Sequence, residues 1–89
     1  MCIRDRVTTA HYNLGLTYLK METYPRAEDS LQKAIVLDAT YKAAHHALAL
    51  AYLGQQELGK ARDAARDALK LDPNYQPARS LLELSLIHI

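Results

Sequence analysis

The chain has 89 residues, of which 49% are hydrophobic and 24% charged, and its formal net charge is +1 at pH 7. This balance lacks the basic excess by which proteins bind nucleic acids or anionic membranes. No apolar run reaches the roughly 20 residues that span a bilayer, and a chain of this length forms one small domain whose single core stabilises it only marginally.

The two ends of the chain do not follow the pattern of its interior. The opening letters MCIRDR and the closing letters LSLIHI can be encoded by one short DNA element read in opposite orientations, and this element is similar to the transposase end used to prepare sequencing libraries. We therefore expect residues 1–6 and 84–89 to be non-native adapter scars and residues 7–83 to be a metagenomic fragment of a longer protein. Chance agreement through codon degeneracy is the alternative. The only cysteine, Cys2, then says nothing about disulfides, metal sites or compartment.

The interior repeats itself after 34 residues. When residues 8–41 are laid over residues 42–75, twelve positions are identical, where this composition would give roughly three by chance. The identical pairs are Ala10/Ala44, His11/His45, Leu14/Leu48, Leu16/Leu50, Tyr18/Tyr52, Leu19/Leu53, Ala27/Ala61, Asp29/Asp63, Ala34/Ala68, Leu37/Leu71, Asp38/Asp72 and Tyr41/Tyr75. Their spacings of three, four and seven are those of one helix face.

The first repeat reads as two helices. One covers about residues 8–21, and its predicted packing stripe is Ala10, Leu14 and Tyr18. The chain then turns near Thr23, and Pro25 suits a first helical turn because no hydrogen-bonded amide is needed there. The second helix runs to about Leu37. Its predicted buried residues are Ala27, Leu31, Ala34 and Ile35.

The second repeat carries different turn residues. Gly54 stands where a helix end favours a left-handed residue, and Gly59 predicts the turn before the next helix. Pro73 and Asn74 predict the end of that helix, and Pro77 can open another. No β-branched alternation occurs, so the sequence predicts an all-α protein.

The chain resembles the tetratricopeptide repeat family. The segments HYNLGLTY (11–18), HALALAY (46–52) and LDPNY (71–75), with alanines and leucines between them, reproduce the 34-residue pattern of that family. The resemblance implies an α-solenoid of antiparallel helix hairpins with about five helices. Repeat 1 would be residues 7–41, repeat 2 residues 42–75, and residues 76–83 would start a third repeat or form a capping helix.

The match to the family pattern is not complete. His11 and His45 replace the usual tryptophan, and Ala39 stands where the first proline belongs. The usual aromatic residue of the second helix is replaced by Leu31 and Ala65, and Glu83 falls where a third repeat would have a small residue. Each helix pair buries its apolar face only against its neighbours, which explains why the chain repeats.

Chemical groups for catalysis or metal binding are poorly arranged in this sequence. The acids recur at repeat spacing, as solvated or capping residues do: they are Asp29, Asp38, Asp63 and Asp72. His11 and His45 would lie on neighbouring helices with axes roughly 8–10 Å apart, but no cysteine or acid completes a ligand set with them and His46. We predict no catalysis, no cofactor and no metal site in this segment.

The resemblance implies a concave groove lined by the first helix of each repeat and by the residues that follow each second helix. The corresponding residues are Thr9, Tyr12, Leu16, Leu19, Lys20, Tyr41, Ala43, His46, Leu50, Leu53, Asn74 and Tyr75. Many of these are apolar, which makes the first helices apolar on nearly every side. They form either a ligand surface or a row of leucines that pack on one another.

The groove residues narrow the choice of partner. Family members that hold the carboxylate end of chaperones use Lys and Asn, whereas this chain has Tyr12, Leu16 and Ala47 there, which argues against such a clamp. An amphipathic helix or an extended apolar peptide of another protein fits better. We predict a protein–protein interaction scaffold that binds neither nucleic acid nor the membrane interior and that can self-associate through its open solenoid ends.

Two other contexts stay open for the parent protein. The repeats could be the docking arm of a larger enzyme, for example a glycosyltransferase. They could also belong to a bacterial envelope or pilus assembly factor, since NLGLTYL and HALALAYL are similar to repeats of pilus biogenesis lipoproteins. The sequence leaves open whether the protein is cytoplasmic or periplasmic.

Overall fold

The computed structural model describes residues 3–80 of the chain. These residues form four α-helices, α1 (Ile3–Lys20), α2 (Tyr24–Leu37), α3 (Lys42–Gly54) and α4 (Leu58–Leu71), and residues 76–80 are helical again. No strand occurs within this range, and the predicted all-α solenoid of helix hairpins is confirmed. The expected scars fall partly outside the described residues and stay a prediction.

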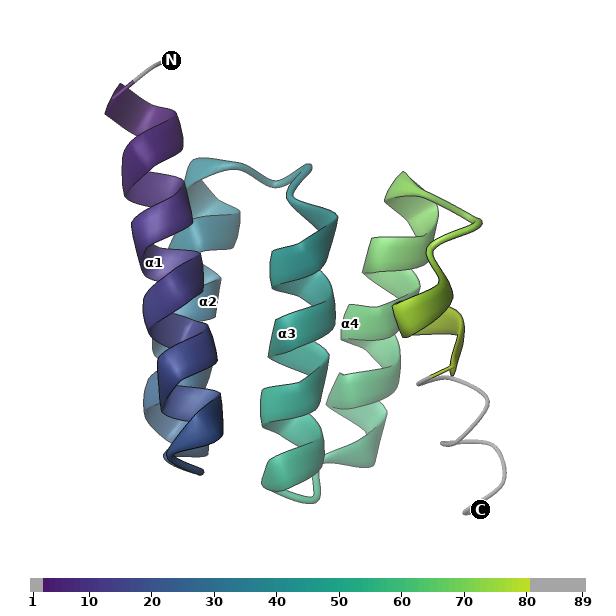
Figure 1. The fold of residues 1–89 in the computed structure, drawn as a ribbon. Helices are drawn as coiled ribbons and strands as arrows, with labels where there is room; N and C mark the ends of the chain where they lie inside the picture. Colours follow the sequence, from purple (N-terminus) through teal and green to yellow (C-terminus); the bar gives the residue numbers. More distant parts are fainter. Residues whose placement is uncertain (1–2, 81–89) are drawn as a thin grey trace.

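Successive helices run antiparallel and stand side by side, with α1 in front of α2 in the view of Figure 1. Each hairpin packs internally, α1 on α2 and α3 on α4, and the hairpins meet where α2 packs on α3. The helix α1 also contacts α3, so the first helices of the two repeats are neighbours. None of the described helices is both long and apolar enough to cross a membrane.

The turn inside each hairpin contains one residue in the left-handed region. Glu22 has φ 60° and its equivalent Gln56 has φ 63°. The sequence predicts this conformation at Gly54, which is wrong: Gly54 is the last residue of α3 and its φ is not positive. Gly54 is needed for space instead, because a Cβ atom there would overlap the ring of Tyr24.

The helices α2 and α4 start at equivalent places with different residues. Pro25 is the second residue of α2, as its fixed φ favours. The sequence predicts a turn at Gly59, but Gly59 lies in the first turn of α4, at the position equivalent to Pro25. The helix α4 therefore begins one residue before the predicted turn, without the proline.

The same turn follows each second helix, which explains the repeated Leu-Asp. Asp38 and Asp72 are the C-cap residues of α2 and α4. The backbone N–H of Thr40 donates to Asp38 Oδ1 at 3.1 Å, and that of Asn74 donates to Asp72 Oδ1 at 3.1 Å. Such Asx turns let a short side chain fix the backbone two residues on. These two acids are structural, as the sequence suggests.

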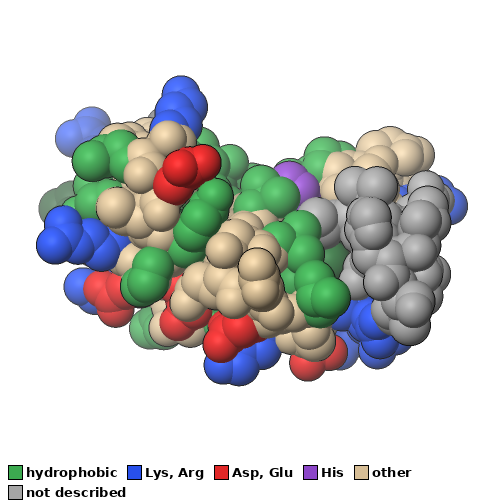
Figure 2. All heavy atoms as spheres, turned by 90° about the horizontal axis from the view of Figure 1, so that it is seen from below, with side chains coloured by type: hydrophobic (Ala, Val, Ile, Leu, Met, Phe, Trp, Pro, Cys, Tyr) green, Lys and Arg blue, Asp and Glu red, His purple; other side chains and the backbone are tan. Residues whose placement is uncertain are grey.

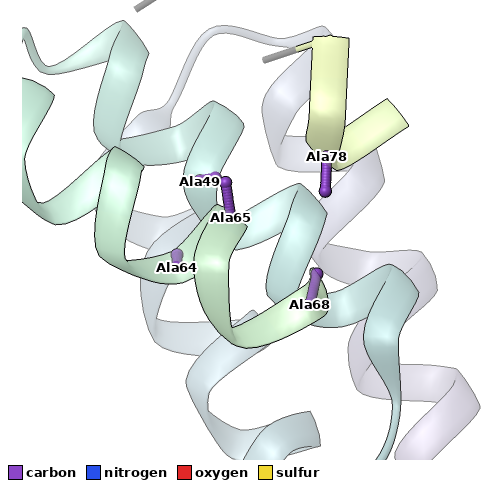
Figure 3. Close-up of a cluster of buried hydrophobic side chains, with 5 residues drawn as sticks. All are labelled: Ala49, Ala64, Ala65, Ala68 and Ala78. Carbon is purple, nitrogen blue, oxygen red and sulfur yellow. The ribbon is translucent and has the colours of Figure 1, made fainter. Parts of the chain in front are cut away.

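The core consists mainly of alanine. One cluster joins α3, α4 and the helical residues 76–80, and Figure 3 shows these side chains converging between the helices. Its members are Ala49, Ala64, Ala65, Ala68 and Ala78. The other cluster joins the two hairpins, with Ala27, Leu31, Ala47, Leu48 and Ala51. Small side chains let the helix axes approach closely, at the low end of the 8–10 Å range.

The predicted packing stripe of the first helix is only partly correct. Tyr18 packs on the inter-hairpin cluster, but Ala10 is exposed and Leu14 is 43% exposed. Among residues 3–80, no helix lies on that side of α1. In the second helix, Ile35 is half-buried while the unpredicted Ser30 is buried.

Candidate functional site

The predicted site residues lie on α1, on α3 and in the turns after α2 and α4. We call them together the α1–α3 face, namely Thr9, Tyr12, Leu16, Leu19, Lys20, Tyr41, Ala43, His46, Leu50, Leu53, Asn74 and Tyr75. Their helical spacing of three, four and seven keeps them on one side of each helix, and α1 contacts α3 directly. Figure 2 views the molecule along the helices from below, where hydrophobic side chains form patches that reach from the middle to one edge and Lys and Arg lie at the periphery.

Two aromatic pairs occupy equivalent places in the two repeats. The ring centroids of Tyr12 and Tyr41 are 5.0 Å apart with the planes tilted by 42°. Those of His46 and Tyr75 are 6.0 Å apart in an edge-on arrangement at 85°. Both are within the favourable range for aromatic pairs. In each repeat the first helix thus presents a ring to the tyrosine that ends the same repeat.

A lysine that the sequence analysis did not select completes this cluster. Lys42 Nζ donates to Asp72 Oδ2 at 2.6 Å and lies 5.2 Å from the ring centroid of Tyr75. Lys42 is the first residue of α3 and directly follows Tyr41. Lys42 stands between Tyr41 and Ala43, which are both predicted site residues, and this position could have indicated that it belongs to the site. The sequence alone did not show that Asp72 would pair with it.

The local environment shifts three pKa values in this cluster. The pKa of Tyr12 is raised, chiefly by burial and further by the nearby Tyr41 and Tyr75. Burial lowers the pKa of His46, because the charged imidazolium is disfavoured where water is partly excluded. The pKa of Asp72 is lowered first by the hydrogen bond from Lys42 and then by the amide of Asn74. At neutral pH, Tyr12 and His46 are therefore both uncharged.

The leucines of the α1–α3 face differ in what they contact. Leu16 and Leu19 pack on the inter-hairpin cluster, and Leu53 packs on the alanine cluster of α4. Leu50 is 36% exposed. Three of the four leucines therefore support the core, whereas Leu50 is partly exposed, and the ligand surface stays a prediction.

The remaining predicted residues lie around this centre. Thr9, Lys20 and Asn74 are exposed, and Ala43 is half-buried. The backbone N–H of Asn74 is engaged with Asp72, as described above. The structure therefore brings the aromatic positions and Leu16, Leu19 and Leu53 into contact with one another or with the core, and leaves Leu50 and the polar positions at the solvent.

Two clefts lie away from the α1–α3 face, and sequence reasoning missed both. The larger, about 440 Å³, lies between α1 and α2 and is lined by Val7, His11, Asp29, Gln32, Lys33, Val36 and Leu37. The other, about 300 Å³, lies between α3 and α4 and is lined by Leu48, Tyr52, Lys60, Asp63, Ala64 and Asp67. The exposed Val36 on α2 was a signal for the first cleft.

The histidines do not form a metal site in the described part of the chain. His45 Nε2 is 2.9 Å from the carbonyl oxygen of Ala39, and His46 is paired with Tyr75. Within residues 3–80, no group of three or more His, Cys, Asp or Glu side chains could hold an ion.

Comparison with known proteins matches both repeats to one family. Two models described as tetratricopeptide repeat match residues 8–41 and residues 42–75. A comparison with curated protein sequences gave no match. The two matched segments adjoin at the boundary between Tyr41 and Lys42, where the structure has the start of α3.

Solved structures with the same arrangement include two peptide complexes. The second repeat domain of human RPAP3, solved with the HSP70 peptide SGPTIEEVD, is similar with a TM-score of 0.85 and 27% identity over 88% of this chain and 65% of that chain. The first repeat domain of Spaghetti (RPAP3), bound to the HSP90 peptide SRMEEVD, has a TM-score of 0.87 and 22% identity over 91% and 64%. A chain of the APC/C hetero-tetramer Cut9–Hcn1 has a TM-score of 0.86 and 32% identity over 89% and 15%. This chain thus spans just under two thirds of the first two neighbours.

Proposed function

The chain belongs to the tetratricopeptide repeat family, and we propose that its α1–α3 face binds an apolar peptide segment of another protein. Repeats of this family are typically scaffold modules without catalysis. The observation that carries the proposal is that Leu50, one helical turn after His46 on α3, is 36% exposed, while Tyr12, Tyr41 and Tyr75 are partly exposed. Exposed apolar and aromatic side chains that lie near one another often mark interaction sites.

The partner differs from the acidic tails that the two RPAP3 domains bind. Both of those peptides end in Glu-Glu-Val-Asp. Lys20 is the only predicted site residue of the α1–α3 face that carries a positive charge. Lys42, which follows Tyr41 in the chain, is already paired with Asp72. We propose that this chain prefers uncharged segments, since none of the predicted site residues is an arginine, whose guanidinium could bind a carboxylate through two hydrogen bonds.

A peptide-display experiment with two matched variants tests this function. Random peptides selected on the full chain should lose at least about tenfold in affinity when Leu50→Asp puts a charge into the contact. Val36→Asp is the control, because Val36 is 82% exposed on α2. Circular dichroism should show both variants folded. Failure to select any peptide, or equal binding to Leu50→Asp, would overturn the proposal.

The acidic peptide SRMEEVD provides a second arm of the test. We expect no saturable binding of this peptide in fluorescence anisotropy, because no unpaired cation cluster meets its carboxylates. Tight binding would show that the face takes acidic tails after all.

The parent protein's role is a wider proposal. We propose a non-catalytic scaffold, in which flanking sequence distinguishes the alternatives. Further repeats favour a scaffold, a catalytic domain favours a docking arm, and a lipoprotein signal favours envelope assembly. A long read of the source DNA, prepared without transposase, would also test the expected scars at residues 1–6 and 84–89.

A further inference from the structure

The tyrosine hydroxyls of the α1–α3 face make no hydrogen bond within residues 3–80. This holds for Tyr12, Tyr41 and Tyr75, although each ring is held by an aromatic or cationic neighbour. Tyr52 differs, because its hydroxyl accepts a hydrogen bond from Gln32 Nε2 at 3.3 Å. The three site tyrosines therefore keep their hydroxyl groups available to a ligand.

The two aromatic pairs that carry these hydroxyls are linked through Lys42 at the start of α3. The ring of Tyr12 pairs with that of Tyr41, and the ring of His46 pairs with that of Tyr75. Lys42 joins the pairs from between, since it follows Tyr41 in the chain and lies over the ring of Tyr75. The three hydroxyls thus belong to two ring pairs that Lys42 connects.

The cluster is electrically neutral at pH 7. The charge of Lys42 is matched by Asp72 at 2.6 Å. The pKa of Tyr12 is raised and that of His46 is lowered, so neither is ionised. The complement of such a surface is uncharged, with carbonyl oxygens to accept from the hydroxyls and apolar groups to lie on the rings.

Backbone conformation decides which uncharged segment provides free carbonyls. A helix uses its carbonyl oxygens internally, from one turn to the next. A polyproline II segment makes no internal hydrogen bonds, so every carbonyl stays free. Proline also has no N–H, and its ring packs on aromatic side chains. Except at its last turn, the backbone of an amphipathic helix would offer these hydroxyls no free carbonyl oxygen.

We propose that the aromatic end of the α1–α3 face, formed by Tyr12, Tyr41, His46 and Tyr75, binds an extended proline-containing segment whose carbonyl oxygens accept from the tyrosine hydroxyls. The inference rests on the proposed peptide-binding function and chooses between its two partner types. The paired rings are already fixed against one another, which lowers the conformational entropy lost on binding. The neighbouring Leu50 then contacts an apolar side chain of the same segment.

Three labelled peptides and two variants of the full chain test this inference by fluorescence anisotropy. The probes are acetylated and amidated PPLPPLPPLPP, its flexible counterpart GGLGGLGGLGG, and the amphipathic helix EALAKLLEALAKLLE. We expect the proline peptide to bind about tenfold or more tighter than either of the others. The triple variant Tyr12→Phe, Tyr41→Phe and Tyr75→Phe keeps the rings and should weaken binding of the proline peptide at least about tenfold, since each of the three lost hydrogen bonds contributes roughly two- to tenfold.

Tyr24→Phe is the matched control, because Tyr24 begins α2 and packs at Gly54. It should leave binding of the proline peptide unchanged. Tighter binding of the helical probe, no binding of the proline probe, or indifference to the triple variant would overturn the inference. If peptides selected by display still bind through Leu50 in that case, the proposed function stands and only this inference fails. If display selects none, both fail.

Discussion

The first helices of the two repeats, α1 and α3, carry many of the same residues in different surroundings. Leu14 in α1 is 43% exposed, whereas its equivalent Leu48 in α3 is 8% exposed. Ala10 is exposed and its equivalent Ala44 is fully buried. The cause is position: α3 is covered by α2 on one side and α4 on the other, while α1 meets α2 and the edge of α3. A shared repeat pattern therefore determines the local fold but not how much each residue contributes to the stability of the protein.

Polar contacts follow the same asymmetry. Across the α2–α3 junction, Gln32 donates to the hydroxyl of Tyr52, and Gln55 Nε2 donates to Glu28 Oε1 at 3.1 Å. In repeat 1 the residues equivalent to Tyr52 and Gln55 are Tyr18 and Met21, and Met21 is 63% exposed. Substitutions at equivalent residues of the two repeats test whether this difference in surroundings changes stability.

The largest difference is expected from truncating the two equivalent leucines. Leu48→Ala should lower the free energy of unfolding by about 2–4 kcal/mol, because it removes buried methyl groups and leaves a cavity. Leu14→Ala should lower it by less than about 1 kcal/mol, since much of that side chain is already in water. Urea unfolding followed by circular dichroism measures both. Equal losses would mean that the exposed side of α1 is covered in solution, and a concentration-dependent midpoint would show self-association.

A smaller effect is expected at the glycine that lies where repeat 2 has alanine. An added Cβ at Gly15 would lie 2.6 Å from Leu31 Cγ, although Ala49 is accommodated at the equivalent position. Leu31 is fully buried, whereas Ala65 occupies its place in repeat 2. Gly15→Ala should therefore destabilise by about 1–3 kcal/mol. The double variant with Leu31→Ala should show a smaller added penalty, and strict additivity would contradict the steric explanation.

Much of the fold could be predicted from the sequence because the repeat spacing and the turn residues agree. Period and helix spacing indicated the hairpins, and Pro25 marked the start of a helix. The residue in the left-handed conformation could not be predicted from glycine positions. Gln56 adopts it because the turn geometry demands it, whereas Gly54 is a glycine for lack of space beside Tyr24.

The candidate site was predictable in outline only. The tyrosines and leucines follow from the family pattern, but which leucine faces solvent depends on neighbours that lie far away in sequence. The ion pair between Lys42 and Asp72 joins residues 30 positions apart. No local sequence pattern predicts this contact, because it depends on the packing of the start of α3 beside the end of α4.

A modest gain in stability is expected where repeat 2 lacks the proline of repeat 1. Gly59 lies in the first turn of α4, and a Cβ there would meet no atom within 4 Å. Gly59→Pro copies Pro25 and should stabilise by about 0.5–1 kcal/mol, because it restricts the unfolded chain at a position that needs no amide hydrogen bond. Gly59→Ala should give a similar gain through helix propensity. Thermal unfolding compares the two, and a loss with proline alone would show that the backbone of α4 starts differently from that of α2.

The smallest expected effect is a pH dependence confined to repeat 2, where His46 replaces Tyr12 of repeat 1. Burial lowers the pKa of His46 below 6.5, so the unfolded chain binds the proton first as the pH falls. Stability from this group is therefore lost as the pH falls from about 6.5 through the folded-state pKa, and the loss then levels off. His46→Tyr should reduce the difference between unfolding midpoints at about pH 8 and about pH 5. The ion pair of Lys42 and Asp72 contributes to stability in a different pH range, because the pKa of Asp72 is lowered from 3.8. Its contribution is complete above that value and is lost as the pH falls through the lower folded-state pKa. If His46→Tyr leaves the difference between about pH 8 and about pH 5 unchanged, the histidine is as hydrated in the folded chain as in the unfolded one, and the two repeats do not differ at this position.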